Sequence, residues 1–317
     1  MSKKVLALGG TGAMGTYLVP KLVEDGYTVD VVSLDDMTSD NPRLRYIKAN
    51  VKDTAVLSEL LYKRYDGIVD FMIYPTGEIP VYLPLMLQNT EHYIYLSSYR
   101  VFADEEHPIV ESSPRLLDVS KDEEYVRSDD YGIYKARGED FLRQSRFRNW
   151  TILRPAITYS RKRCQLITLE RFHLLPYIRS GKPVPLFDKA LTVQGTMSWA
   201  GDVAEMQRRL LFNEKAICED FNVTTSEHHS WGEIAEYYKD LFGLNYQPVD
   251  EETYFLARAD YNETSRQALK WQLWYDRMFN RIMDNSKVLK VTGLKQSQLM
   301  PLYEGLKLER KTILEED

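Results

Sequence analysis

Tyr131, Lys135 and Ser98 have the chemical types needed to exchange a proton with a substrate hydroxyl or carbonyl group. Tyr131 and Lys135 are four residues apart, so on a helix both project from one face. A tyrosine that gives or takes a proton near neutral pH needs its pKa of about 10 lowered by about three units. A neighbouring ammonium and a nicotinamide cation are plausible sources of that shift. Ser98, at a predicted strand end, would orient the substrate oxygen.

The Tyr-x-x-x-Lys spacing alone is weak evidence, because the chain has 22 tyrosines and Tyr17 and Lys21 repeat the pattern. Tyr17 lies just past a glycine-rich turn, with no strand-end serine before it. Only the second copy follows a predicted strand that ends in Ser97-Ser98. Placement therefore selects Tyr131 as the candidate.

A nucleotide-binding turn is predicted near the start of the chain. The apolar run at residues 4–8 is followed by Gly9-Gly10-Thr11-Gly12-Ala13-Met14-Gly15 and then by a helical pattern closed by Gly26. Strand, glycine turn and helix in this order predict dinucleotide binding. The pyrophosphate would lie against backbone N–H groups at the positive end of the helix. The alternative is a tight turn that only packs a helix on a sheet.

The second predicted strand, residues 28–33, indicates which dinucleotide is bound. Asp35 and Asp36 follow Gly15 by about 20 residues, where an acidic side chain hydrogen-bonds the adenosine ribose. No arginine or lysine between Val29 and Pro42 is available for a 2′-phosphate. The pattern favours NAD over NADP, although both aspartates could instead lie in a solvated loop.

Further strands are expected at residues 44–49, 67–73, 93–96 and 150–155, separated by helices. Asp53 is the expected N-cap of a helix over 54–64, and Ser230 with Glu233 is expected to form a capping box. This alternation predicts an α/β fold with a doubly wound parallel sheet of the Rossmann type. The long polar stretch 103–130 is expected to lie over a site.

The regular alternation stops near Pro155, which suggests two domains. We predict a Rossmann domain over residues 1–158 and a smaller, mostly helical substrate domain over 159–317. Residues 194–225 are expected to return to the Rossmann sheet. Apolar spacing around residues 166–178 is typical of a helix, and the part after about residue 245 reads as aromatic and helical.

Composition bounds the possible partners. The 317 residues carry a net charge of −6, so no global basic field attracts nucleic acid or a membrane. The one local basic cluster is Arg161-Lys162-Arg163. Two distant cysteines indicate reduced thiols, and no metal-ligand spacing, signal peptide or apolar span is evident. We expect a cytoplasmic protein with no metal, no membrane and no nucleic-acid partner.

These motifs resemble a known family. The glycine turn, Ser97-Ser98 with Val101-Phe102, the Tyr131–Lys135 pair and Leu153-Arg154-Pro155 resemble the extended short-chain dehydrogenase/reductase superfamily. Within it, the NAD-dependent epimerase/dehydratase family, which acts largely on nucleotide sugars, is the most similar branch. Members commonly pair through helices that include the one bearing the tyrosine, so a homodimer is possible.

The resemblance implies roles for individual residues. Tyr131 would be the catalytic acid/base, Lys135 would bind the nicotinamide ribose and lower the Tyr131 pKa, and Ser98 would hydrogen-bond the substrate. The expected cofactor-binding residues are Gly9, Thr11, Gly12, Ala13, Met14, Gly15, Ser33, Asp35, Asn50, Val51, Tyr131, Lys135 and Pro155.

The residues expected to contact the substrate depart from the family pattern. Ile157 stands where an asparagine commonly contacts the ligand, and Ser160 replaces an expected glycine. The stretch Gln194-Gly195-Thr196 lacks the arginine that usually grips the diphosphate. Arg161–Arg163 could supply phosphate contacts or form a solvated loop. The aromatic stretch 271–279 could line the cleft or pack in the core.

We therefore expect an NAD-dependent enzyme of the epimerase/dehydratase type, acting at a carbinol carbon of a sugar or nucleotide sugar. One alternative is an NAD(P)-dependent dehydrogenase or reductase of a non-nucleotide small molecule. Another is a non-catalytic nucleotide- or RNA-binding relative. The acidic net charge counts against RNA, because such binding depends on clustered lysine and arginine.

Overall fold

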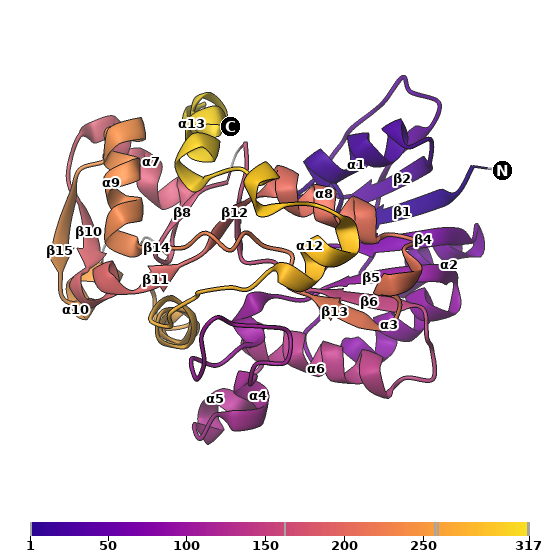
Figure 1. Cartoon of the computed structure of the whole chain (residues 1–317), viewed down its shortest axis with the longest axis horizontal. Helices are drawn as coiled ribbons and strands as arrows, with labels where there is room; N and C mark the ends of the chain where they lie inside the picture. The colour runs from indigo at the N-terminus through magenta and orange to yellow at the C-terminus, as the bar shows by residue number, and fades with distance from the viewer. Residues whose placement is uncertain (1, 162, 257, 259, 316–317) are drawn as a thin grey trace.

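A seven-stranded parallel sheet forms the centre of the molecule (Figure 1). The computed structural model describes residues 2–161, 163–256, 258 and 260–315, so Lys162 of the basic cluster lies outside the described residues. The strands of the sheet are β1 (Lys4–Leu8), β2 (Thr28–Ser33), β3 (Leu44–Lys48), β4 (Tyr65–Asp70), β5 (Thr90–Leu96), β6 (Trp150–Leu153) and β13 (Glu219–Phe221).

The strand order is β13-β6-β5-β4-β1-β2-β3, and every pairing is parallel. The order reverses between β1 and β4, which makes the carboxyl end of β1 a topological switch point where ligands bind in such sheets. The predicted doubly wound parallel sheet is confirmed. Strand β13, residues 219–221, is the part of the expected return segment 194–225 that pairs in this sheet.

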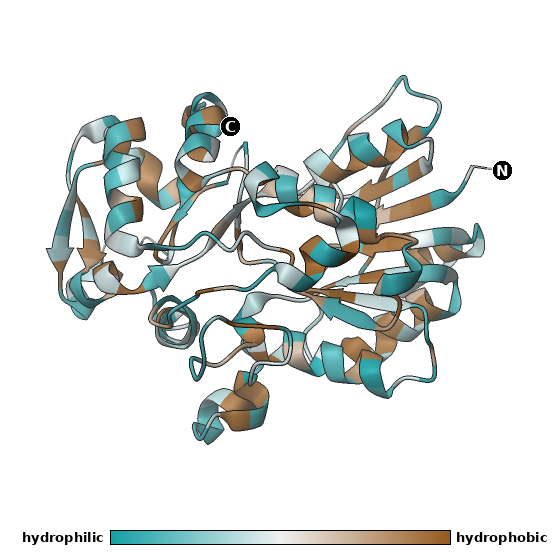
Figure 2. Cartoon of the chain, viewed as in Figure 1, coloured by the Kyte–Doolittle hydropathy of each residue, from teal (hydrophilic) through white to brown (hydrophobic). Residues whose placement is uncertain are grey.

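Helices cover both faces of the sheet (Figure 1). One layer contains α1 (Gly15–Glu24), α8 (Ala200–Leu210) and α12 (Ser286–Thr292), and the other contains α2 (Thr54–Tyr62), α3 (Ile79–Gln88) and α6 (Tyr131–Gln144). Strand β1 alternates between them, since Val5 and Ala7 pack in one buried cluster and Leu6 and Leu8 in the other. The central strands are accordingly hydrophobic along their length (Figure 2).

Strand β4 ends at Asp70 and does not reach residue 73. The buried Asp70 carboxylate accepts the Met72 N–H at 2.9 Å and the Tyr93 hydroxyl at 2.7 Å. These bonds turn the chain away from the sheet directly after the strand. The predicted caps are confirmed, because Asp53 accepts the Ala55 N–H at 2.9 Å and Ser230 and Glu233 form a capping box.

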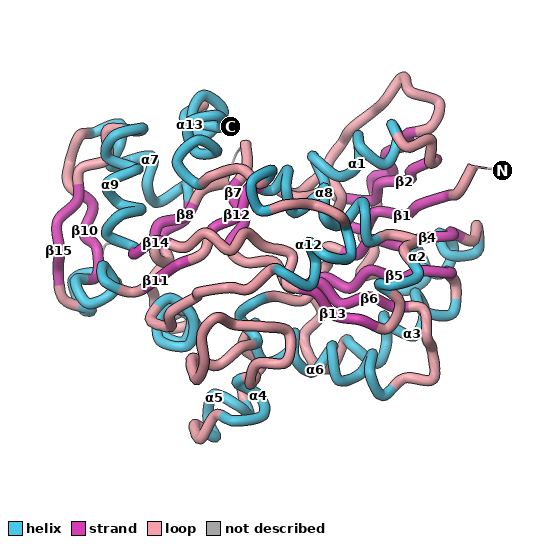
Figure 3. The backbone as a smooth tube through the Cα atoms, viewed as in Figure 1, coloured by secondary structure: helices cyan, strands magenta, loops and turns pink. Residues whose placement is uncertain are grey.

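The second half of the chain mixes helices with small two-stranded sheets (Figure 3). Its elements are β7 (Ile157–Tyr159), β8 (Gln165–Leu166), β9 (Leu169–Glu170), α7 (Arg171–Ser180), β10 (Val184–Phe187), β11 (Gln194–Gly195), β12 (Met197–Trp199), β14 (His229–Ser230), α9 (Trp231–Phe242), β15 (Tyr246–Val249), α10 (Glu251–Leu256), α11 (Arg266–Gln272) and α13 (Leu302–Leu314). The division into two domains at about residue 158 stays a prediction.

Two helical expectations in this half are wrong in part. Leu166 and Leu169 pair in a tight hairpin that turns at Ile167, whose φ is +54°, so the helix begins only at Arg171. Strand β15 pairs in parallel with β10 where a helix was expected. Neither short pairing leaves a periodic signature long enough to distinguish it from helix.

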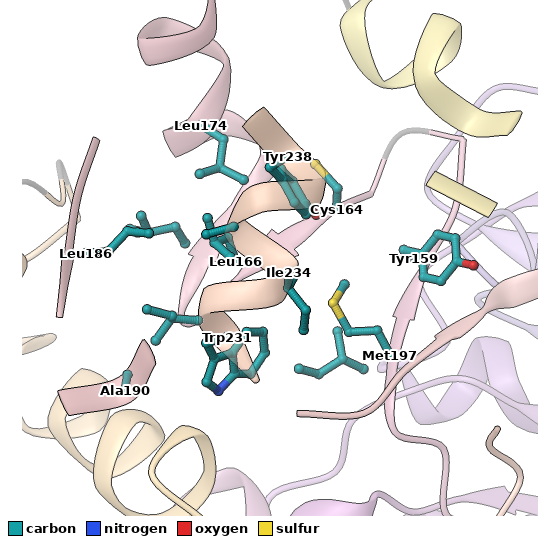
Figure 4. Packing of buried hydrophobic residues seen from close by; sticks show 14 of the residues in the cluster. Tyr159, Cys164, Leu166, Leu174, Leu186, Ala190, Met197, Trp231, Ile234 and Tyr238 are labelled. Carbon is teal, nitrogen blue, oxygen red and sulfur yellow. The ribbon is translucent and has the colours of Figure 1, made fainter. Parts of the chain in front are cut away.

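A second hydrophobic core lies under α9 (Figure 4). Trp231, Ile234 and Tyr238 of this helix are buried with Met197 of β12 and Tyr159 of β7. This core fixes the second half against the carboxyl edge of the central sheet. Within the described ranges, no helix is both long and apolar enough to cross a lipid bilayer.

Candidate active site

The glycine turn after β1 brings the amino end of α1 close to the sheet. Gly9 has φ +71°, and a Cβ at Gly10 would come within 2.9 Å of the Ala7 Cβ. A Cβ at Gly15 would overlap the Gly10 backbone. By contrast, a Cβ at Gly12 would meet only the Gly9 carbonyl oxygen at 3.5 Å. Gly9 is thus needed for its backbone angle, and Gly10 and Gly15 are needed for close packing. Gly12 leaves space above the turn.

A cavity of about 510 Å³ lies above this turn. Its lining residues are Thr11, Gly12, Ala13, Thr16, Ser160, Arg161, Arg163, Glu170 and Thr312. The helix amino end and the arginines suit a bound anion such as a pyrophosphate. Arg161 also stacks over Tyr17, with its Cζ 5.4 Å from the ring centroid. The structure therefore places Arg161 and Arg163 against the predicted nucleotide turn.

A second cavity, of about 290 Å³, contains the three candidate catalytic residues. Ser98 follows β5, Tyr131 begins α6, and Lys135 lies one turn further along that helix. Met14 and Pro155 from the expected cofactor set also line it. Arg163 and Glu170 line both cavities, so the space above the glycine turn adjoins the space around Tyr131.

Tyr131 is surrounded by opposing electrostatic influences. Burial raises its pKa, while the Arg100 and Arg163 charges and a hydrogen bond with Ser98 act to lower it. The net direction in the free protein is upward. Tyr131 is therefore protonated at neutral pH in this state, and the lowering needed for base catalysis must come with the bound ligands.

Lys135 is buried among backbone carbonyls. Its Nζ donates to the Leu96 oxygen at 2.6 Å and to the Met72 oxygen at 3.3 Å, and lies 5.8 Å from the Tyr131 ring centroid. Burial lowers the Lys135 pKa to about 8, against the attraction of Asp70. An ammonium with so low a pKa in a cavity is typical of a functional site.

The remaining expected cofactor residues follow β2 and β3 at the same edge of the sheet. Ser33 ends β2, and its Oγ accepts the Asp35 N–H at 3.1 Å. Asn50 follows β3, its Oδ1 accepts the Lys52 N–H at 3.0 Å, and Val51 is buried. Their contact with a cofactor stays a prediction.

The sequence of the chain is similar to that of known proteins over part of its length. No protein-family model matches the chain. Chloroplast stem-loop binding protein of 41 kDa b from Arabidopsis thaliana is 26% identical over 249 residues, which cover 74% of this chain. The chain spans 62% of the length of that curated relative.

Solved structures match over nearly the whole chain. UDP-glucose 4-epimerase from Thermotoga maritima, solved with UDP-glucose, has a TM-score of 0.68 at 19% identity and 98% coverage of both chains. UDP-glucuronic acid 4-epimerase from Bacillus cereus, solved with UDP-glucuronic acid and NAD, has a TM-score of 0.71 at 16% identity and the same coverage. The chain therefore shares the fold of these two epimerase structures. The predicted resemblance is confirmed at this level.

Sequence reasoning missed several residues of the cavity around Tyr131. Arg100 and Arg277 line the cavity beside Tyr131, together with Gln165, Glu170 and Gln272. Arg100 is two residues from Ser98, a signal that could have been followed. Arg277 carried no such signal, because it reaches the site from a π-helical turn, Leu273–Arg277, far along the chain.

The stretch 271–279 was expected either to line the cleft or to pack in the core, and different side chains of it do each. Trp271 and Tyr275 pack against the buried Tyr125 of the 103–130 segment, and Phe279 packs on the same cluster and against Tyr275. Among the described residues of the stretch, the side chains that line the cavity around Tyr131 are polar, namely Gln272 and Arg277. The rings therefore hold the 103–130 segment in place and leave the cavity wall polar.

Proposed function

We propose that this chain is an NAD-dependent enzyme of the epimerase/dehydratase type, with Tyr131 as its acid/base. The substrate would be a sugar or nucleotide sugar that reacts at a carbinol carbon. The observation that carries the proposal is the meeting of Ser98, Tyr131 and Lys135 in one cavity that adjoins the cavity over the glycine turn.

The residues present fit a dinucleotide. The glycine turn, the amino end of α1 and Arg161 would hold the pyrophosphate, and Lys135 would hold the nicotinamide ribose. Acidic Asp35 without a nearby cation favours NAD over NADP. When bound, NAD would accept the hydride from the substrate carbon and, in an epimerase, return it.

The chain itself would bind, orient and exchange a proton. Ser98 would hydrogen-bond the substrate oxygen, and the Tyr131 oxygen would take the hydroxyl proton as the C–H bond breaks. Return of the same proton would complete reduction of the carbonyl.

The substrate class rests on similarity in fold. The two neighbours named above are UDP-sugar epimerases by their titles. The family asparagine is replaced by Ile157, which is buried in the cavity wall. A dehydrogenase acting on a non-nucleotide small molecule is therefore the alternative. Cofactor retained through purification would favour an epimerase, whereas dependence on added NAD would favour a dehydrogenase.

The part of the proposal that concerns NAD binding is tested by filling the space above the glycine turn. Gly12→Val adds a side chain whose Cβ would meet only the Gly9 oxygen, at 3.5 Å, so the fold should tolerate it while pyrophosphate is excluded. We expect NAD affinity to fall at least about tenfold in calorimetry, since one displaced polar contact is worth about 1.5 kcal/mol. Gly77→Val is the matched control, because a Cβ added at Gly77 would meet nothing within 4 Å. Equal NAD affinity in both variants would contradict this placement of the cofactor.

A second candidate function is RNA binding, which is favoured by similarity to the stem-loop binding protein. The net charge of −6 opposes it, because non-specific RNA affinity depends on counterion release. A salt-sensitive shift of a stem-loop RNA at physiological ionic strength would support this candidate, and no shift would remove it.

A further inference from the structure

Arg100 lies beside the catalytic tyrosine in a fixed position. It belongs to a short 3-10 turn, η1 (Tyr99–Val101), and its Cζ is 5.1 Å from the Tyr131 ring centroid. The Ser98 Oγ accepts the Arg100 N–H at 3.2 Å, so one turn of chain orients both side chains. Both residues line the catalytic cavity.

Two carboxylates hold the Arg100 guanidinium from different elements. Its Nη2 donates to Asp130 Oδ1 at 3.2 Å, and Asp130 is the N-cap of α6 immediately before Tyr131. Its Nε lies 3.3 Å from Oδ2 of Asp276, which belongs to the π-helical turn. The side chain is only 12% exposed. The charge is therefore kept next to Tyr131 and away from bulk water.

Lys135 is less well placed to put a positive charge next to Tyr131. Its Nζ is further from the Tyr131 ring, at 5.8 Å, and is engaged by the Leu96 and Met72 carbonyl oxygens. Burial lowers its pKa to about 8, so part of its charge is lost at mildly alkaline pH. A guanidinium keeps its charge throughout this range.

We propose that Arg100 is a positioning residue of the reaction, whose fixed charge stabilises the Tyr131 phenolate. The inference rests on the proposed function, in which Tyr131 is the acid/base. It assigns Lys135 chiefly to the cofactor and gives the electrostatic role to a residue outside the Tyr-x-x-x-Lys pair.

The other groups that face Tyr131 do not replace Arg100. They are Arg163 from the loop after β7, Lys135 and Tyr134 from α6, Asp130 at its cap, and Tyr95 from β5. Asp130 opposes ionisation of Tyr131, and burial is the largest influence raising the Tyr131 pKa. Arg100 is the strongest influence lowering it, ahead of Arg163.

The size of the effect follows from Coulomb's law. A unit charge at about 5 Å, with an effective dielectric constant of about 20, changes a pKa by about two units. Partial compensation by Asp130 reduces this value. We therefore expect loss of the Arg100 charge to raise the Tyr131 pKa by about one to two pH units.

The test is a titration of position 131 in the full-length protein. Replacement of Tyr131 by 3,5-difluorotyrosine places fluorine at this one position of the chain and lowers the phenol pKa, so the fluorine resonances report the titration of this ring alone. Arg100→Gln should move this titration upward by about one to two pH units, and Arg100→Lys should restore most of the difference. Arg137→Gln, on the same helix but bonded to Thr76 and Val126, should leave it unchanged.

An unchanged titration in folded Arg100→Gln would overturn the inference. If that variant does not fold, Lys135→Met decides, because the inference requires it to move the titration upward by less than the one to two pH units assigned to Arg100. A larger upward movement would identify Lys135 as the source of the charge and overturn the inference. The titration needs no substrate, so it is independent of the turnover measurement that tests the function of Tyr131.

Discussion

The Lys135 ammonium lies where its charge is costly for folding. Its side chain is 1% exposed, and burial lowers its pKa from 10.5 to about 8. Between these two pH values the unfolded chain binds the extra proton, so this group makes stability rise with pH. A residue that disfavours folding at neutral pH is retained for another reason, which we assign to binding the cofactor.

Lys135→Met should therefore lose activity without losing stability. We expect its free energy of unfolding at pH 7 to equal or exceed that of the wild type, by up to about 3 kcal/mol. The rise of stability between pH 8 and 10.5 should disappear in the variant. Urea titrations across this pH range measure both effects. A marked loss of stability at pH 7 would show that Lys135 is needed for the fold.

At the scale of elements, a buried ion pair fixes helix α6 against strand β6. Glu139, one turn after Lys135, accepts from Arg154 Nε and Nη2 at 2.7 Å each and from the Ser97 hydroxyl at 2.6 Å. Despite burial, the Arg154 charge holds the Glu139 pKa at about 2. This ion pair sets the position of α6 along the sheet, and with it the position of Tyr131 at the sheet edge.

Glu139→Gln should be strongly destabilising, because it leaves Arg154 buried without its main partner. We expect a loss of about 3–5 kcal/mol at neutral pH by denaturant unfolding. The contribution of Glu139 is complete above pH 4.5 and is lost as pH falls towards 2, so the difference between wild type and variant should shrink in acid. Glu59→Gln, on an exposed face of α2, should change stability by less than about 0.5 kcal/mol. A similar small effect at Glu139 would show that other carboxylates serve Arg154 equally well.

At the scale of the whole molecule, the last helix ties the second half to the nucleotide turn. Glu309 of α13 accepts from the Tyr17 hydroxyl at 2.5 Å and from Trp199 Nε1 at 2.9 Å. Thr312 of the same helix lines the cavity above the turn. Helix α13 thus closes one side of the expected cofactor site, although it is about 290 residues away in sequence from Tyr17.

Gly305 permits this close approach, because a Cβ there would overlap the Tyr159 hydroxyl. Gly305→Ala should push α13 away and cost about 1–3 kcal/mol of stability, together with some affinity for NAD. Gly77→Ala is the control, since Gly77 has open space around it, and it should be neutral within about 0.5 kcal/mol. Thermal unfolding compares the two. Unchanged stability of Gly305→Ala would show that the helix can shift without loss.

Sequence patterns predicted what depends on local order and missed what depends on distant contacts. The glycine turn, the Asp53 cap and the pairing of Tyr131 with Lys135 each lie within a few residues, and short-range chemistry specifies them. The partner of Arg154 was not predicted, because Glu139 comes from a different element. Arg277 enters the cavity around Tyr131 from a turn more than 170 residues after Ser98 and bonds to Tyr99. Such placements follow from the packing of the whole chain.

The central claim is that Tyr131 transfers the proton in a reaction dependent on NAD. The most direct measurement compares wild type, Tyr131→Phe and Tyr134→Phe, each supplied with NAD and with UDP-glucose or UDP-glucuronic acid, by nicotinamide absorbance and sugar analysis. We predict that Tyr131→Phe binds NAD like the wild type but turns over at least about a hundredfold more slowly, the range typical of a lost acid/base group. Tyr134→Phe, one residue before Lys135, should retain activity. Equal turnover by wild type and Tyr131→Phe would contradict the account.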